Sequence, residues 1–346
     1  MTRSQDQRPN ILISTYLEPE FVDRIVHKVP CAVLYEPDLL PRPRYLNDHG
    51  GTEPALSRQQ QAEWSSMLAV ADIAFDFDWW APADLLTNAP RLRWVQATSA
   101  GIGGFVQRHG LDGGELILTT AAGVHAAPLA EFAVAGALHF AKDVPGLQSS
   151  QRAHHWQRHV SGQLAGRRAT IVGLGSIGRR VAEVYDVLGM RVTGVGRAGR
   201  RYEVPDGVAV IATEEIDQVL PTTDVLVLAC PLTEQTRDLV DASRVMALPA
   251  GAIVVNIARG QVIDERALIA GLQSGHLAGA ALDVFATEPL PDGSALWDMP
   301  NVLVSPHSAS TAPAENDVLT DLFIDNLLRF LSDQPLRNLY QRDLGY

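Results

Sequence analysis

Three ionisable side chains, Arg259, Glu288 and His307, each follow shortly after an apolar stretch that is typical of a buried strand. A guanidinium can hold a carboxylate, a carboxylate can orient an imidazole, and an imidazole can exchange protons near neutral pH. Ligands of parallel sheets bind beyond the carboxyl ends of the strands, so three such groups at three strand ends can converge. Taken singly, each has a simpler explanation as a surface cation, a turn residue before Pro289 or a structural histidine.

A glycine motif comes directly after the apolar stretch 169–172 and opens a helix-like stretch at 179–188. In this pattern the first glycine makes the tight turn, the second admits a pyrophosphate, and the third allows close packing of helix on strand. The N-terminus of the helix supplies free N–H groups and partial positive charge. The residues predicted to bind a dinucleotide are Gly173, Gly175, Ser176, Ile177 and Gly178. A strand–helix turn without a ligand is the alternative.

The next strand, 192–195, bears on the choice between NAD and NADP. An NAD site places a carboxylate about 20 residues beyond the motif, against the ribose hydroxyls. Here the strand is followed by Arg197, Arg200 and Arg201, with Glu203 close behind. Guanidinium groups suit a 2′-phosphate through bidentate, charge-assisted hydrogen bonds. We therefore expect NADP, with NAD as the less favoured cofactor, and expect Arg197 and Arg200 to contact it.

The elements that must position these residues alternate between strand-like and helix-like lengths, as in parallel sheets covered on both faces. The first strands are expected at 10–14, 31–35, 73–77 and 92–97, with helices at 18–26 and 59–70 and a loop at 36–58. The second strands are expected at 169–172, 191–195, 208–211, 224–228, 252–256, 279–282 and 302–304. An apolar helix is expected at 129–147 and an amphipathic one at 314–331.

Composition excludes several classes of protein. The 346 residues carry a formal net charge of −12, which disfavours nucleic acid as a partner. Two cysteines are too few for a disulfide framework, and no Cys/His spacing resembles a metal site. The polar N-terminus lacks a signal-peptide core, and no apolar run reaches the roughly 18 residues of a membrane span. We expect a cytoplasmic, soluble protein without a metal.

From Leu92 to His307 the chain resembles the D-isomer-specific 2-hydroxyacid dehydrogenase family. Besides the glycine motif, the resemblance rests on the segments 94–101, 130–132, 224–236, 248–260, 282–285 and 306–309. It implies two doubly wound α/β domains, with a Rossmann cofactor domain inserted in a flavodoxin-like substrate domain. We place the substrate domain at 1–122 and 306–346, and the cofactor domain at 123–305.

The resemblance also implies roles for individual residues. His307 would donate the proton to the carbonyl oxygen, Glu288 would orient and charge it, and Arg259 would bind the substrate carboxylate. The backbone of Ser99, Ala100 and Gly101 would receive the same carboxylate. The further cofactor contacts that it implies are Pro231, Thr236, Ile257, Ala258, Asp283 and Ala309. For Asp283, a turn carboxylate is the simpler alternative.

Several segments depart from the family pattern or stay open. Ile102-Gly103-Gly104 stands where many members have Gly-Val-Asp, which puts a helix cap or substrate contact there in doubt. The loop 36–58 matches nothing specific. Trp156 either reaches a partner's active site or packs at a dimer interface, and both imply a homodimer. Trp79 and Trp80 either line a substrate cleft or pack in the core.

The sequence therefore predicts an NAD(P)-dependent oxidoreductase that interconverts a small 2-keto acid and a D-2-hydroxy acid, with glyoxylate, hydroxypyruvate or pyruvate as the size class. One alternative is a D-3-phosphoglycerate dehydrogenase, although only a short segment follows His307. A different alternative is a non-enzymatic, cofactor-sensing protein of the corepressor type, which shares this fold. Neither nucleic acid nor a membrane is expected as a partner.

Overall fold

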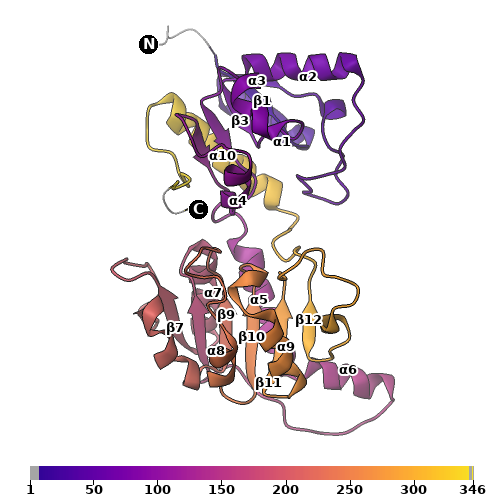
Figure 1. Ribbon diagram of the computed structural model, residues 1–346, viewed down its shortest axis with the longest axis vertical. Helices are drawn as coiled ribbons and strands as arrows, with labels where there is room; N and C mark the ends of the chain where they lie inside the picture. The colour runs from indigo at the N-terminus through magenta and orange to yellow at the C-terminus, as the bar shows by residue number, and fades with distance from the viewer. Residues whose placement is uncertain (1–7, 343–344, 346) are drawn as a thin grey trace. The chain divides into compact units, whose positions relative to one another are not determined.

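The computed structural model describes residues 8–342 and 345 (Figure 1). The chain divides into two compact units, one holding the chain up to His125 and again from Thr311, the other holding Ala126–Ser310. The divisions lie a few residues beyond the boundaries that the sequence predicts. Each unit is built on one sheet, and the strands within both sheets pair in parallel, which confirms the predicted fold class.

The first unit has a five-stranded sheet in the order β2-β1-β3-β4-β5, the flavodoxin-like order. The strands are β1 (Asn10–Ile13), β2 (Ala32–Leu34), β3 (Ile73–Phe75), β4 (Trp94–Gln96) and β5 (Ile117–Thr119). The helices are α1 (Pro19–Lys28), α2 (Arg58–Val70), α3 (Leu85–Asn88), α4 (Gly103–Arg108) and α10 (Glu315–Leu331), with single 3₁₀ turns at Pro37–Leu39 and Pro82–Asp84.

Side-chain alternation along the strands divides the core of this unit into two layers. Ile11 and Ile13 point to the face covered by α1 and α10, where Phe323 is fully buried. Leu12 points to the opposite face, against Trp64 and Leu68 of α2. The amphipathic segment predicted at 314–331 is therefore the helix α10, which returns to the first unit.

Two features of the first unit differ from the sequence analysis, and the structure bears on a third that the sequence left open. Strand β5 and helix α4 were not predicted, and α4 begins without a side-chain cap at Ile102. Strand β3 ends at Phe75 because Asp76 adopts a left-handed backbone conformation (φ 69°). Trp79 packs against Trp64 with a centroid distance of 6.1 Å, whereas Trp80 remains half exposed.

The second unit has a seven-stranded sheet in the order β12-β11-β10-β9-β6-β7-β8, in which the order reverses between β6 and β9. The strands are β6 (Arg168–Val172), β7 (Arg191–Gly196), β8 (Ala209–Ala212), β9 (Val225–Leu228), β10 (Ala252–Asn256), β11 (Leu277–Leu282) and β12 (Val302–Val304). Helices α5 (Ala126–Ala141) and α7 (Ser176–Val187) cover one face, and α8 (Ala242–Ala247) and α9 (Glu265–Gln273) the other (Figure 1). Short 3₁₀ turns lie at Thr213–Gln218, Leu220–Thr222, Gly260–Val262 and Ala295–Trp297.

The single helix predicted at 129–147 is wrong. Two helices occupy this stretch, α5 and then α6 (Val144–Arg152). Asp143 interrupts them with a left-handed conformation (φ 51°) and caps α6 by accepting a hydrogen bond from the Gly146 N–H (3.2 Å). Pro145 cannot donate a backbone hydrogen bond and fits the first turn of a helix, so it favours a new start here.

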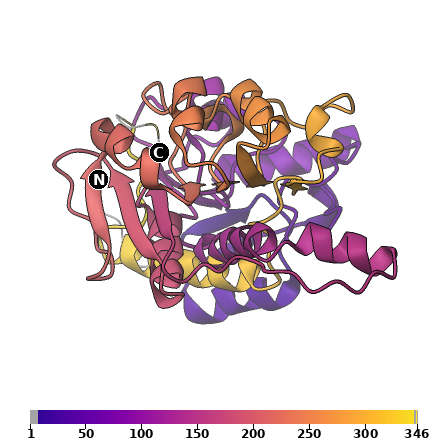
Figure 2. The ribbon, with the colours of Figure 1, turned by 90° about the horizontal axis from the view of Figure 1, so that it is seen from below.

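Helix α6 and the segment after it project from the sheet of the second unit (Figure 2). Trp156 and Val160 in this segment are almost fully exposed, at 96% and 98%. The apolar surface of α5, by contrast, is buried inside the unit, where Gly136 packs directly against Ala281 of β11. Within the described residues no helix combines the length and apolar character needed to cross a membrane.

Candidate active site

The glycine motif lies at the carboxyl end of β6, next to the point where the strand order reverses. Gly173 has φ 96°, and a side chain there would collide with the backbone of Cys230. A Cβ at Gly178 would lie 1.8 Å from the Gly173 carbonyl oxygen, so only glycine lets α7 pack this close to the strand. Gly175, in contrast, faces open space, with nothing within 4 Å of a Cβ. Each glycine thus meets the requirement that the motif predicts.

The start of α7 fits a pyrophosphate. Gly175 is its N-cap and carries no side chain, so no side-chain oxygen caps the helix. The first backbone N–H groups of α7 have no partner within the helix, and they carry the positive end of the helix dipole. A bare, open and uncapped helix N-terminus of this kind can receive a phosphate group.

Arg259 is positioned by a turn after β10. The buried Asn256 shapes this turn, because its amide donates to the Arg259 carbonyl (3.1 Å) and accepts from the Ala258 N–H (3.1 Å). One guanidinium nitrogen, Nη1, donates to the Ala258 carbonyl (2.6 Å). A guanidinium has five N–H donors, and within the described chain the remaining donors of Arg259 form no bond, so they can bind a carboxylate.

Gly260 joins the Arg259 turn to the loop after β11. A Cβ at position 260 would lie 1.8 Å from the carbonyl carbon of Phe285, so the two backbones touch. Gln261 Nε2 donates to the Ala286 carbonyl (2.8 Å), and the Ala286 N–H donates to Glu265 Oε2 (2.9 Å). The loops of these two neighbouring strands are therefore fixed relative to each other.

Glu288 and His307 form a close pair at the ends of β11 and β12. His307 Nδ1 lies 2.7 Å from Glu288 Oε2, and the other carboxylate oxygen accepts the Phe285 N–H (3.0 Å). The side chains are 44% and 35% exposed for His307 and Glu288, so both remain within reach of a ligand. With Nδ1 engaged by the carboxylate, Nε2 is the imidazole atom left to meet a substrate.

Asp283 holds the turn that carries His307. Its Oδ1 accepts hydrogen bonds from Ser305 Oγ (2.6 Å), the Ser308 N–H (2.9 Å) and the Ala309 N–H (3.0 Å). These bonds stabilise His307 in its left-handed conformation (φ 53°). Burial raises the pKa of the Asp283 carboxyl, and the hydrogen bonds partly offset this. Its Oδ2 accepts no hydrogen bond from the described residues and remains able to accept one from a ligand amide.

The loop after β7 holds the arginines expected at the ribose. The Arg197 N–H donates to the Tyr202 hydroxyl (2.8 Å), and the Tyr202 ring packs on Gly196. The Arg200 guanidinium lies 5.5 Å from the centre of the same ring. Glu203 is 96% exposed and pairs with Arg179 at 3.5 Å. Both predicted arginines are therefore exposed at the carboxyl end of the strand next to the glycine motif.

The remaining predicted cofactor residues lie at the same edge of the sheet. Thr236 Oγ1 donates to the Pro231 carbonyl (2.7 Å) and closes the turn after β9. Ile257 and Ala258 are buried between β10 and Arg259, and Ala309 follows His307. The seven-stranded sheet thus gathers the glycine motif and Arg259, Glu288 and His307 along the carboxyl ends of its strands.

Ser99, Ala100 and Gly101 belong to the first unit, where they follow the carboxyl end of β4. The Ser99 carbonyl accepts the Ala121 N–H (3.0 Å), and the Gly101 N–H donates to Ser99 Oγ (3.3 Å). Ser99 and Gly101 are exposed. The turn therefore has a defined shape at the ligand-binding edge of its own sheet.

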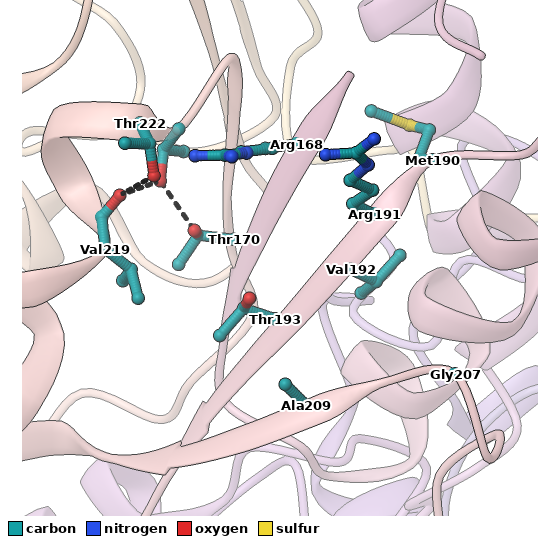
Figure 3. A pocket seen from close by; sticks show the side chains of 11 residues that line it. Arg168, Thr170, Met190, Arg191, Val192, Thr193, Gly207, Ala209, Val219 and Thr222 are labelled. Atoms are coloured by element: carbon teal, nitrogen blue, oxygen red, sulfur yellow. Dashed lines mark hydrogen bonds between the residues drawn. The ribbon is translucent and has the colours of Figure 1, made fainter. Parts of the chain in front are cut away.

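The opposite edge of the seven-stranded sheet carries a hollow of about 380 Å³ (Figure 3). Its lining includes Arg168, Arg191 and a hydrogen-bonded pair of hydroxyls, Thr170 and Thr223, at 2.6 Å. None of the predicted site residues lines it. Separately, three or more His, Cys, Asp or Glu side chains are nowhere grouped as metal ligands within 8–342 and 345.

Sequence reasoning missed how the catalytic candidates are held. The role of Asp283 at the His307 turn had one signal in the sequence, a carboxylate directly after the strand β11. The contacts of Gln261 and Glu265 with Ala286 gave no signal, because they depend on the packing of two loops. The Gly260 requirement was visible only as a glycine directly after Arg259.

Comparisons with known proteins agree with this geometry. A family model described as D-isomer specific 2-hydroxyacid dehydrogenase, NAD binding domain, matches residues 134–309. Glyoxylate reductase of Aeropyrum pernix is 32% identical over 270 residues, which cover 75% of this chain and 80% of that protein. D-3-phosphoglycerate dehydrogenase of Mycobacterium bovis is 34% identical over 246 residues, but these cover 69% of this chain and only 45% of that protein.

A solved structure covers nearly the whole chain. It is the D-isomer specific 2-hydroxyacid dehydrogenase of Xanthobacter autotrophicus Py2 in complex with NADPH and MES, with a TM-score of 0.79 and 28% identity over 98% of this chain and 100% of that one. The fold and the strand-end site define an NAD(P)-binding oxidoreductase. The chain belongs to the D-isomer specific 2-hydroxyacid dehydrogenase family and is a 2-hydroxyacid dehydrogenase.

Proposed function

We propose that this enzyme reduces a small 2-keto acid, of the size of glyoxylate, hydroxypyruvate or pyruvate, to the D-2-hydroxy acid with NADPH. The observation that carries the proposal is the Glu288–His307 pair at 2.7 Å. The pair follows β11 and β12, the two strands that come after the Arg259 strand β10 in the same sheet as the glycine motif. The name of the Aeropyrum pernix relative supports the substrate class, and the NADPH complex of the Xanthobacter autotrophicus structure supports the cofactor.

His307 is the proton donor in this proposal. When bound, the reduced nicotinamide supplies the hydride to the carbonyl carbon. The His307 imidazolium uses Nδ1 to donate to Glu288 and keeps Nε2–H for the carbonyl oxygen, which needs a proton as the hydride arrives. Glu288 stabilises the charged ring and fixes its orientation, and the Phe285 N–H in turn fixes Glu288.

Arg259 binds and orients the substrate. Its free N–H donors hold the carboxylate of the keto acid, with the backbone of Ser99, Ala100 and Gly101 as the second set of donors. Fixing the carboxylate fixes the neighbouring carbonyl carbon, which lowers the entropic part of the barrier. The substrate-domain role of 1–122 and 306–346, and the cofactor-domain role of 123–305, belong to this proposal.

The cofactor contacts are proposed from the same edge of the sheet. The start of α7 binds the pyrophosphate, and Pro231 and Thr236 flank the ribose and phosphates. Asp283 Oδ2, together with the Ile257 carbonyl, accepts hydrogen bonds from the nicotinamide amide. Arg197 and Arg200 bind the 2′-phosphate, so the enzyme is expected to prefer NADPH over NADH.

We also propose a homodimer in which the projecting segment around Trp156 packs against the partner subunit. The Trp156 indole is 96% exposed in the single chain, and burying it against a partner subunit would stabilise the dimer. Sedimentation at micromolar concentration should give the mass of a dimer, and Trp156→Ala should shift the equilibrium towards the monomer. A wild-type monomer would contradict this part of the proposal. The cytoplasmic location stays a prediction.

The direct test is oxidation of NADPH and NADH, followed by absorbance, with glyoxylate, hydroxypyruvate, pyruvate, phenylpyruvate and 3-phosphohydroxypyruvate. We expect turnover with the first three acids and a higher kcat/KM with NADPH. Preferred turnover of 3-phosphohydroxypyruvate would instead favour a D-3-phosphoglycerate dehydrogenase, the function of the Mycobacterium bovis relative. Tight NADPH binding without turnover of any acid would contradict the proposed reaction.

A further inference from the structure

A second group of carboxyl and imidazole side chains lies inside the first unit, outside the proposed machinery. Glu315, in the first turn of α10, has its Oε1 at 3.9 Å from His49 Nε2 and at 3.9 Å from His125 Nδ1. All three side chains are at least 88% buried. His125 is the last residue before the chain leaves this unit, and Glu315 comes shortly after it returns.

The loop that bears His49 is closed on itself. Backbone hydrogen bonds join Arg42 and Thr52 in both directions, at 2.9 and 2.8 Å. Within the loop, the Arg44 guanidinium binds both carboxylate oxygens of Asp48, at 2.7 and 3.0 Å. We call residues 42–52 the 42–52 loop. It displays two apolar side chains, Tyr45 and Leu46, that are more than half exposed.

Three contacts fasten the 42–52 loop to the rest of the unit. Asn47 Nδ2 donates to the Ala312 carbonyl (2.6 Å), just before α10. Thr15 Oγ1, directly beyond β1, contacts both His49 Nδ1 and the His49 carbonyl at 3.2 Å. The third contact is between His49 and Glu315. These contacts place the loop beyond the carboxyl ends of the strands, the same edge of this sheet at which Ser99–Gly101 follows β4.

The contact between His49 and Glu315 leaves polar atoms of both side chains without a hydrogen bond. His49 Nε2 and Glu315 Oε2 are buried without a hydrogen-bond partner in the described structure. The 3.9 Å between His49 Nε2 and Glu315 Oε1 is too long for a hydrogen bond. Metal ligands would lie nearer 2 Å from a common point, and no such grouping is present in the described chain. With no metal-ligand grouping and no direct hydrogen bond between the two groups in the described structure, the property of the pair that can still vary is whether it retains one proton, on either the carboxyl or the imidazole.

Burial and nearby charges act on His49 in opposite directions. Burial is the larger effect and favours the neutral imidazole, whereas the carboxyl groups of Asp76, Glu18 and Asp48 favour its protonated form. Burial raises the pKa of Glu315 to about 7 and lowers the pKa of His49. Loss of the last proton of the pair therefore leaves a buried carboxylate beside a neutral imidazole, which is unfavourable.

We propose that Glu315 and His49, with His125 beside them, are positioning residues that share a proton and thereby fasten the 42–52 loop to the start of α10. The fastened loop presents Tyr45 and Leu46 at the edge of the sheet that also carries the turn proposed to receive the substrate carboxylate. The loop then sets which side chain the keto acid can carry. This last step rests on the proposed function, whereas the fastening does not.

The fastening is tested without any substrate, by hydrogen exchange of the 42–52 amides from about pH 6 to pH 9, corrected for intrinsic rates. In the wild type, protection of the Arg42 and Thr52 amides should fall at least about threefold as the pH rises past neutral. Glu315→Gln keeps the volume but cannot lose the proton, so its protection should not change with pH. Glu63→Gln, an exposed carboxyl on α2, is the matched control and should follow the wild type.

The same pH course in wild type and Glu315→Gln would overturn the proposal. His49→Gln provides a second variant, should Glu315→Gln not fold, and it should also remove the pH dependence. With substrate, KM of the wild type should rise above neutral pH, and Glu315→Gln should remove that rise while matching the wild-type kcat at each pH. Absence of turnover on every keto acid would end the proposed function but leave the exchange result standing.

Discussion

The two units each contain a carboxyl–imidazole pair, and the pairs differ in length and burial. In the second unit, Glu288 and His307 are 2.7 Å apart and 35–44% exposed. In the first unit, Glu315 and His49 are 3.9 Å apart and about 90% buried. A short, exposed pair can hand a proton to a ligand, whereas a loose, buried pair responds to pH through its effect on packing. We therefore propose that the same two groups serve proton transfer in the second unit and positioning in the first.

The backbone around each pair fits this division. The His307 turn is held by three hydrogen bonds to Asp283 Oδ1, so that the ring stays fixed without burial. The 42–52 loop is held by the contacts of Asn47 and Thr15 and, in our proposal, by the pair itself. Removing a pair member should therefore stop chemistry in the second unit and loosen a loop in the first.

The largest effect is expected for His307→Gln. Loss of the proton donor should lower kcat by a factor on the order of 10² or more, while the affinity for NADPH stays nearly unchanged. Steady-state kinetics and a fluorescence titration of NADPH measure both. A wild-type rate in this variant would show that His307 is not the proton donor. The two pairs would then not differ in the way proposed.

Gly260→Ala should disturb the second unit without changing any ionisable group. The new Cβ would meet the backbone of Phe285, which cannot move aside as a side chain can, so the Arg259 turn and the Glu288 loop must separate. We expect kcat/KM to fall by roughly 10- to 100-fold and Tm to fall as well. Gly293→Ala, where a Cβ has open space, is the control and should behave as the wild type.

Glu315→Gln should change the pH dependence of stability. A carboxyl whose pKa is raised from 4.5 to about 7 stabilises the fold at low pH, and that contribution is lost as the pH rises through about 7. The wild type should therefore lose about 2 kcal/mol relative to Glu315→Gln between about pH 5 and pH 8. Urea unfolding at several pH values measures it. Parallel curves for the two proteins would show that Glu315 does not titrate in this range.

Arg197→Asp should affect neither carboxyl–imidazole pair. It serves as the reference for a substitution that changes only the cofactor preference. Replacing a guanidinium by a carboxylate at the end of β7 should lower the ratio of kcat/KM for NADPH to that for NADH by about tenfold. The pH dependence of loop exchange at 42–52 should stay as in the wild type. An unchanged cofactor ratio would contradict the contact with the 2′-phosphate.

Much of the fold could be predicted because its signals are local. Near-continuous apolar stretches gave the strands of both sheets, and the glycines at 173 and 178 reflect a positive φ and a backbone contact that other residues cannot satisfy. The division of 129–147 into α5 and α6 was missed although Pro145 signalled it, because apolar composition was given more weight than the proline. Strand β5 was missed because only Ile117–Thr119 pair in it.

The positioning contacts could not be predicted, because they join residues far apart in the chain. His49 meets Glu315 only when α10 returns to the first unit, and Asp283 meets Ser308 only when β11 and β12 are neighbours. A lone histidine in a loop and a lone glutamate at the start of a helix carry no local signal of a partner. Arg259, Glu288 and His307 could be singled out as candidates because longer motifs surround each of them.

The most direct test of the contrast is kcat and KM for one keto acid with His49→Gln and His307→Gln, measured side by side from about pH 6 to pH 9. His307→Gln should lose kcat with little change in KM. His49→Gln should keep kcat near the wild-type value and raise KM, with the pH dependence of KM removed. Loss of kcat in His49→Gln comparable to that in His307→Gln would show that the buried pair takes part in the chemistry and would contradict the account.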